Sequence, residues 1–156
     1  MKTDSVYFRV LEPNDADSIT TSQLLQHFYD CNTIIADVYM QAHIAKLCTL
    51  ATMIVANIND KKHIGLCACY MNNYETRTAY ITHIAISPQY RGCGYGKQLL
   101  EKTIALAIEK GFLYLNLEVV KTNIPALTLY QSYHFTIIED RNTKYLMSLH
   151  LADKSR

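Results

Sequence analysis

A mixed α/β domain is the fold class that this sequence predicts. Segments in which every second residue is apolar, which is typical of strands, alternate with segments in which apolar residues recur every three or four positions, which is typical of helices. Some strands are joined by short polar links and others are separated by a helix, so a mixed sheet is expected. The 156 residues are 49% hydrophobic and show no repeat, low-complexity tract or linker. Residues 1–156 are therefore expected to form one domain with its own core.

The first half of the chain is expected to hold a strand, two helices and three further strands. Alternating apolar residues predict the first strand over residues 5–11, and Pro13 ends it. Apolar residues at helical spacing predict helices over residues 18–29 and 33–47. Strands are predicted over residues 52–58, 63–71 and 79–86. The short polar links between them favour antiparallel neighbours.

The second half is expected to begin with a loop over residues 87–96. An amphipathic helix follows, with Gly111 as its C-terminal cap and these residues facing inward: Leu99, Leu100, Thr103, Ile104, Ala107 and Ile108. Residues 112–120 are almost uninterruptedly apolar, which predicts a strand covered on both faces. A short helix is predicted from Asn123 to about Ser132. A hairpin closes the chain, with strands over residues 135–139 and 143–149 and a turn over 140–142.

Charge and cysteine content exclude several classes of protein. Lys and Arg number 15 against 14 Asp and Glu, so the chain lacks the basic excess of a protein that binds duplex nucleic acid or an anionic membrane. No apolar stretch reaches the ~18 residues of a membrane span, and the first ten residues have no signal-peptide core. The five cysteines form no CxxC pair, so we expect neither a zinc site nor any other metal site. A reduced, soluble, cytoplasmic protein is the expectation.

Residues 91–97, which read Arg-Gly-Cys-Gly-Tyr-Gly-Lys, carry the clearest chemical motif. Alternate glycines allow a tight turn and let a ligand approach the backbone amides. The helix that follows adds unpaired N–H donors and the positive end of its dipole, so the segment is suited to a phosphate or pyrophosphate.

Two common phosphate loops fit this segment poorly. A P-loop needs Ser or Thr where Gln98 stands, and its earlier glycine falls at another spacing. A dinucleotide fingerprint needs its third glycine where Lys97 stands, although Glu118 lies where that fold places a ribose-binding acid. The antiparallel strands expected upstream do not suit a doubly wound sheet.

Arg91, Gly94 and Gly96 match a third pattern, (Gln/Arg)-x-x-Gly-x-(Gly/Ala), and there the chain resembles the GNAT superfamily of N-acetyltransferases. The resemblance covers about residues 80–135 and includes residues 84–90, residues 115–119, the pattern Asn123-x-x-Ala126-x-x-x-Tyr130, and Phe135. The chain has His134 where a glycine usually precedes Phe135.

The resemblance implies the GNAT acyl-CoA N-acyltransferase fold, a mixed central sheet flanked by helices. Two parallel strands, here residues 79–86 and 112–120, splay apart at their C-terminal ends, and acetyl-CoA lies in the gap. Pantetheine pairs with the backbone around Ile84 and Ile86, and the pyrophosphate lies on the loop amides. The residues implied in binding the coenzyme are Ile84, Ala85, Ile86, Arg91, Gly92, Cys93, Gly94, Tyr95, Gly96, Lys97, Asn123 and Tyr130.

Acetyl transfer to an amine needs a base for the amine and an acid for the departing thiolate. Tyr130 matches the tyrosine that many members place beside the CoA sulfur, so we expect it to be the acid; Tyr133 is the alternative. Glu118 is the first candidate base and His83, whose imidazole titrates near neutral pH, is the second. Asn123 is also expected to cap the short helix. Cys93 is either a thiol activated by the helix N-terminus or simply a small loop residue.

The resemblance implies that the acceptor amine is set where family members diverge, here in the first two predicted helices and the final hairpin loop. The polar candidates there are His27, Tyr29, Asp30, Asp37, Tyr39 and His43. Their mixed polarity leaves polyamines, amino sugars, aminoglycosides and protein amines open, with a small amine or amino sugar favoured.

The predicted function is direct acetyl transfer from acetyl-CoA to a primary amine in a ternary complex. The alternative is a non-catalytic acyl-CoA-binding regulatory module, which needs the glycine loop but neither Tyr130 nor a base. A nucleotide-binding dehydrogenase is a third possibility, and it would bind NAD instead. Homodimers are common in the family, and only that analogy extends them to this chain.

Overall fold

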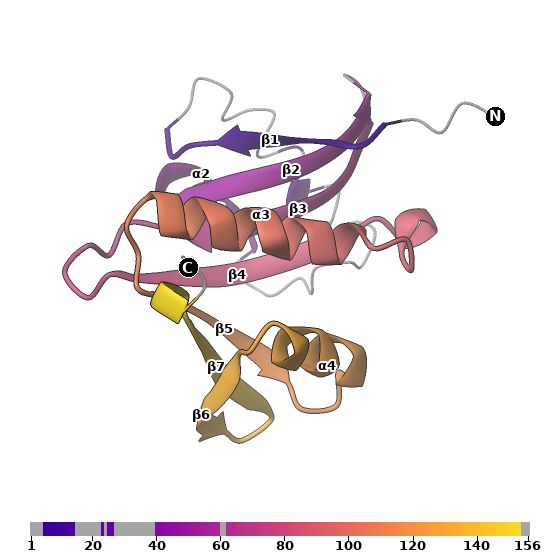
Figure 1. The fold of residues 1–156 in the computed structure, drawn as a ribbon. Coiled ribbons are helices and arrows are strands. Elements are labelled where there is room, and N and C mark those ends of the chain that lie inside the picture. Colours follow the sequence, from indigo (N-terminus) through magenta and orange to yellow (C-terminus); the bar gives the residue numbers. More distant parts are fainter. Residues whose placement is uncertain (1–4, 15–22, 24, 27–39, 60–61, 154–156) are drawn as a thin grey trace. The chain divides into compact units, whose positions relative to one another are not determined.

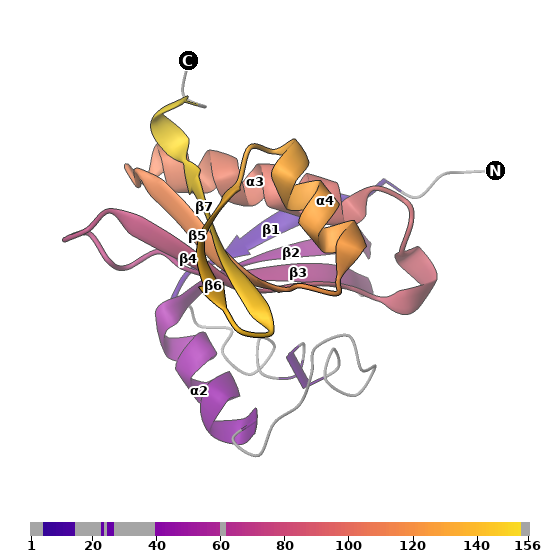
Figure 2. The same cartoon turned by 90° about the horizontal axis from the view of Figure 1, so that it is seen from below.

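The structure is a computed structural model that describes residues 5–14, 23, 25–26, 40–59 and 62–153. Figure 1 shows its ribbon and Figure 2 the same ribbon seen from below. The helices are α2 (Met40–Leu50), α3 (Tyr95–Glu109) and α4 (Ile124–Ser132), with short 3-10 turns η1 (Pro88–Tyr90) and η2 (Leu151–Asp153). The strands are β1 (Tyr7–Leu11), β2 (Ala51–Asn59), β3 (Lys62–Tyr70), β4 (Thr78–Ile86), β5 (Tyr114–Val120), β6 (Thr136–Arg141) and β7 (Lys144–His150).

The seven strands form one sheet in the order β1-β2-β3-β4-β5-β7-β6. β1 pairs antiparallel with β2, β4 pairs parallel with β5, and β7 pairs antiparallel with both β5 and β6. The parallel strands β4 and β5 are joined through α3, because parallel neighbours need a crossover connection. The predicted mixed α/β class with a mixed sheet is therefore confirmed.

The chain divides into two compact units. One comprises Met1–Cys69 and His83–Thr103, and the other comprises Tyr70–Thr82 and Ile104–Arg156.

The core of the first unit is centred on β2 and β3. Residues 51–57 and 64–69 are buried without interruption, so both faces of these strands are covered. Cys67 and Cys69 are among them, and small hydrophobic residues of this kind are typically buried. Burial raises the pKa of the Cys67 thiol to about 12.

Gly65 on β3 lets α3 approach the sheet closely. A Cβ built at Gly65 would lie 2.6 Å from Ile86 Cδ1, 3.0 Å from the Ala85 carbonyl oxygen and 3.2 Å from Leu99 Cδ1. The missing side chain therefore lets Leu99 and Ile86 close over the β3 backbone.

In the second unit β5 departs from the sequence prediction. Its residues alternate between buried and more exposed, with Tyr114 41% and Val120 38% accessible, so the expectation of a strand covered on both faces was wrong. Leu115, Leu117 and Val119 form the buried face. The apolar run was misleading because tyrosine and valine are tolerated at partly exposed positions.

Several element boundaries also differ from expectation. α3 begins at Tyr95, which lies inside the predicted loop. Gly96 is tolerated in the first turn of the helix, because the amides of that turn need no intrahelical acceptor. Ile108 is only half-buried, whereas the other five predicted inward residues of α3 are buried. The hairpin turn is tighter than predicted: β6 runs to Arg141, and Asn142 adopts a left-handed φ of 67°.

Part of the N-terminal prediction lies outside the described residues. That applies to most of the helix predicted over 18–29 and to residues 33–39 of the next helix. The described part of the latter is α2, which continues three residues beyond the predicted end at Leu47.

Candidate active site

The glycine loop, which is the segment over residues 91–97 that leads from β4 into α3, has open space beside its backbone. Gly92 and Gly94 have φ of 76° and 86°, a backbone conformation that favours glycine. A Cβ built at either position would have no atom within 4 Å, so the space beside this backbone is free. The bond from Gln98 N to the Gly94 carbonyl, 3.1 Å, enters the helix, so the amides just before it have no intrahelical acceptor. This donor-rich backbone is chemically suited to a diphosphate.

The base of the loop is anchored by hydrogen bonds. The buried Ser87 donates its amide to the Ile64 carbonyl at 2.8 Å, which fixes the end of β4 beside β3. Two backbone hydrogen bonds then form η1: the Tyr90 amide donates to the Ser87 carbonyl at 2.9 Å, and the Arg91 amide donates to the Pro88 carbonyl at 3.3 Å. Arg91 also donates from Nε to the Ile86 carbonyl, 3.2 Å, so its guanidinium is held at the end of the strand.

Cys93 lies exposed within this loop. Its Sγ is 3.7 Å from the Arg91 carbonyl oxygen, a local contact inside the turn. This contact suits a small loop residue.

The parallel pairing of β4 with β5 ends before either strand does. The register runs from Thr78 opposite Tyr114 to Ile81 opposite Leu117, while β4 continues to Ile86 and β5 to Val120. The backbone of residues 118–120 therefore lies beyond the β4–β5 pairing, although it remains paired with β7.

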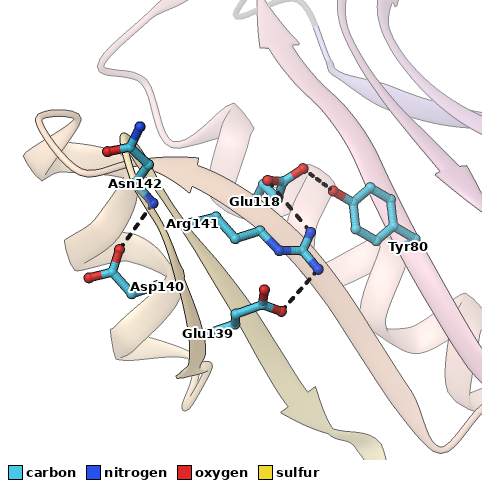
Figure 3. Close-up of polar contacts among 6 residues, drawn as sticks. All are labelled: Tyr80, Glu118, Glu139, Asp140, Arg141 and Asn142. Carbon is cyan, nitrogen blue, oxygen red and sulfur yellow. Dashed lines mark hydrogen bonds and ion pairs between the residues drawn. The ribbon is translucent and has the colours of Figure 1, made fainter.

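Glu118, the first candidate base, belongs to a polar network in the second unit (Figure 3). Tyr80 donates its hydroxyl to Glu118 Oε1 at 2.9 Å, and Arg141 Nη1 lies 3.7 Å from Glu118 Oε2. Arg141 Nη2 also pairs with Glu139 at 3.1 Å. Burial, and then the hydrogen bond to the Glu118 carboxylate, raise the pKa of Tyr80 well above its usual range. The carboxylate is thus oriented by a phenol that stays protonated.

Asp140, in the β6–β7 hairpin, stabilises the turn beside Arg141. Its Oδ1 accepts the amide of Asn142 at 3.1 Å and pairs with Lys121 Nζ at 2.5 Å. The Lys121 hydrogen bond holds the pKa of Asp140 below its usual value.

Asn123 and Tyr130 lie at opposite ends of α4. Asn123 caps the helix, accepting the Ala126 amide at 3.3 Å, so the predicted cap is confirmed. Tyr130, half-buried, has its ring centroid 5.7 Å from that of Phe135. Between them His134 adopts a left-handed φ of 72°, so it keeps the backbone shape for which a glycine is usual.

His83, the second candidate base, contacts His43. The Nε2 atoms of His43 on α2 and His83 on β4 lie 2.9 Å apart, and the rings meet edge to face. One ring donates an N–H and the other accepts it, and the tautomers of the two rings set which is the donor. The other five acceptor candidates, His27, Tyr29, Asp30, Asp37 and Tyr39, lie outside the described residues.

Sequence reasoning missed Tyr80, Arg141 and the pairing of His43 with His83. Each partner is distant in sequence, 38 residues for Tyr80 and Glu118 and 40 for the two histidines. Arg141 was assigned to a turn, and no sequence signal connects it with Glu118.

The described residues contain no group of three or more His, Cys, Asp or Glu placed to hold a metal ion. None of the helices that these residues form is long and apolar enough to cross a bilayer.

Comparison with known proteins identifies the family to which this chain belongs. Residues 21–135 match the acetyltransferase (GNAT) family, so the chain belongs to that family and the resemblance seen in the sequence is confirmed.

Two curated relatives share part of this chain. It is 39% identical over 88 residues to the [ribosomal protein bS18]-alanine N-acetyltransferase of Haemophilus influenzae, covering 56% of this chain and 58% of the relative. It is 32% identical over 68 residues to the thialysine N-epsilon-acetyltransferase of Bos taurus, covering 44% of this chain and 40% of the relative. The match thus spans between two fifths and three fifths of each relative's length.

Solved structures share the fold over nearly the whole chain. The ribosomal-protein-S18-alanine N-acetyltransferase of Escherichia coli matches with a TM-score of 0.72 at 19% identity, over 93% of this chain and 94% of that one. The paia N-acetyltransferase of Thermoplasma acidophilum, solved in complex with coenzyme A, matches with a TM-score of 0.67 at 18% identity, over 94% and 99%. These likenesses establish the fold.

Proposed function

We propose that this protein transfers an acetyl group from acetyl-CoA to a primary amine by direct transfer in a ternary complex. The observation that carries the proposal is the open glycine loop at the start of α3, in a chain of the GNAT family. The amides of residues 92–97 would hold the diphosphate, with Arg91 beside it. The backbone of residues 84–86 would pair with pantetheine, and Asn123 would reach the coenzyme from the start of α4.

In the proposed reaction the acceptor ammonium first gives up a proton to a base. Glu118 is the first candidate, because Tyr80 and Arg141 hold its carboxylate in place; His83 is the second. The neutral nitrogen then attacks the thioester carbonyl, and the C–S bond breaks. The thiolate takes a proton from the Tyr130 phenol, and the resulting phenolate regains one that the new amide nitrogen loses, directly or through water. The base then releases its proton to solvent.

The acceptor is proposed as a primary amine without further restriction. The two relatives are named for the nitrogen of an alanine of ribosomal protein bS18 and for the ε-nitrogen of thialysine. Protein amines therefore stand beside the small amine or amino sugar that the sequence favoured. We also infer a cytoplasmic location, which the free thiols of the four described cysteines support.

Thermal unfolding with acetyl-CoA, CoA, NAD and ATP tests the coenzyme. A ligand at ~100 times its dissociation constant adds ~2.7 kcal/mol, or roughly 5–11 °C for a domain of this size. Stabilisation by acetyl-CoA and CoA is expected. Stabilisation by NAD alone would refute the proposal in favour of a dehydrogenase.

Two glycines with the same backbone strain provide a matched test of the loop. Gly94→Ala and Gly111→Ala both place a Cβ at a φ near 86°, costing about 1–2 kcal/mol each. Only the first fills space beside the loop amides, so only Gly94→Ala should weaken CoA binding. Equal CoA affinity in the two variants would contradict the assigned diphosphate site.

Tyr130→Phe separates the enzyme from a non-catalytic coenzyme-binding module. We expect CoA affinity to be retained and thiol release with an amine panel to fall, whereas Tyr133→Phe should leave turnover unchanged. The reverse pattern would move the acid to Tyr133. Absence of turnover from the wild-type protein with every amine, despite CoA binding, would favour the binding module.

A further inference from the structure

Lys62, the first residue of β3, carries a cation to the edge of the glycine loop. Its Nζ lies 5.1 Å from the centroid of the Tyr90 ring, and Tyr90 immediately precedes Arg91. The Tyr90 ring in turn lies 6.5 Å from the ring of Tyr95, at the first turn of α3. Lys62 is exposed, whereas both rings are half-buried. The aromatic ring therefore holds a solvent-accessible ammonium at a defined place beside the loop.

The backbone fixes the same neighbourhood independently of these side chains. The hydrogen bond from the Ser87 amide to the Ile64 carbonyl joins the start of β3 to the end of β4, just before η1. Lys62 is two residues from Ile64, and Tyr90 is three from Ser87. The position of Lys62 beside the loop thus follows from strand pairing as well as from its contact with Tyr90.

Strand pairing also limits the path of a coenzyme bound as proposed above. At its C-terminal end β4 uses one edge to pair with β3, through Ser87 and Ile64. Pantetheine that pairs with residues 84–86 must therefore use the opposite edge. A diphosphate on the loop amides would lie over the end of β4, close to the side of the loop where β3 begins with Lys62.

Charge near the loop suits a second phosphate group. The segment over residues 87–98 contains Arg91 and Lys97 and no acidic residue. Arg91 and the amides are proposed to hold the diphosphate, which leaves Lys62 as a separate cation beside the loop for the remaining phosphate of coenzyme A. Lysine binds phosphate as a point charge and needs no bidentate geometry.

We propose that Lys62, positioned by Tyr90, binds the 3′-phosphate of the adenosine in coenzyme A and so selects CoA over its 3′-dephospho form. This inference rests on the proposed function and adds a specificity-determining residue to it. Lys62 is the binding residue and Tyr90 the positioning residue.

Isothermal titration of CoA and 3′-dephospho-CoA into the wild-type protein and its variants tests the proposal. The wild-type protein should bind CoA about 2- to 5-fold more tightly, since the contact is exposed. Lys62→Gln should lower CoA affinity to that of 3′-dephospho-CoA and leave the latter unchanged, whereas Lys62→Arg should keep the preference. High salt should reduce the preference, because an exposed charge contact is screened.

Lys102→Gln is the matched control. Lys102 is also an exposed lysine over an aromatic ring, with Nζ 5.6 Å from the Phe8 centroid, and it has no assigned role in binding. The Lys102→Gln variant should bind both coenzymes as tightly as the wild-type protein does. Tyr90→Leu should reduce the preference for CoA and leave 3′-dephospho-CoA binding unchanged.

The outcomes separate this inference from the proposed function. Equal binding of both coenzymes by the wild-type protein would overturn the role of Lys62 and leave the proposed function intact. A preference that survives in Lys62→Gln, with the variant folded by circular dichroism, would also overturn it. Binding of neither coenzyme would overturn the proposed function itself.

Discussion

Replacing Gly65 by alanine should destabilise the protein because the new methyl group has no room. The Cβ would lie 2.6 Å from Ile86 Cδ1 and 3.0 Å from the Ala85 carbonyl oxygen. The first atom is the end of a side chain, but the second is backbone of β4 and moves only with the strand. Leu99 Cδ1 lies 3.2 Å from the new Cβ, so the methyl group cannot move toward α3 either.

Overpacking of this kind costs about 1–3 kcal/mol, and the lower backbone entropy of alanine returns roughly 0.5–1 kcal/mol. We therefore expect a net loss of roughly 1–2 kcal/mol, or about 2–8 °C in Tm for a chain of this length. Thermal and urea unfolding followed by circular dichroism measure it. CoA affinity should also fall, since residues 84–86 are proposed to pair with pantetheine.

A double-mutant cycle identifies the cause of the loss. Ile86→Val removes the Cδ1 atom nearest to the new methyl, so Gly65→Ala should cost less in the Ile86→Val background than in the wild type. Gly96→Ala is the control, because its Cβ would meet only Ile86 Cγ1, at an ordinary 3.9 Å, and it should not lose stability. A neutral Gly65→Ala, or equal costs in the two backgrounds, would refute the packing argument.

Three further results are expected from named contacts. Asn123→Ala removes the cap of α4 and should cost about 1 kcal/mol in urea unfolding; an unchanged midpoint would show that the cap contributes nothing. Alanine substitutions of His43 and His83 should couple by about 0.5–1.5 kcal/mol in a stability cycle, and strict additivity would exclude their hydrogen bond. Glu118→Gln should lower the pKa of Tyr80 toward its ordinary value in an NMR titration of the tyrosine rings, because it removes the negative charge that opposes ionisation; an unmoved resonance would leave burial as the whole cause.

Features encoded by neighbouring residues were predictable from the sequence. The strand and helix periodicities, the glycine loop before α3 and the Asn123 cap depend on residues a few positions apart, so the sequence displays them directly. The loop pattern was specific enough to indicate the family that the comparison confirmed. Which of the site residues act in the reaction stays a prediction.

Features that depend on how distant segments pair were decided by the tertiary structure. Sheet register pairs Tyr80 with Asn116, two residues before Glu118, so its hydroxyl reaches the Glu118 carboxylate, and the hairpin brings Arg141 to the same carboxylate. β5 has one buried face, which an apolar run cannot reveal because composition does not record which side a residue faces. The meeting of Lys62 with Tyr90 likewise follows from the pairing of β3 with the end of β4. Local patterns fix the elements, whereas register fixes which side chains touch, and register is a property of the assembled sheet.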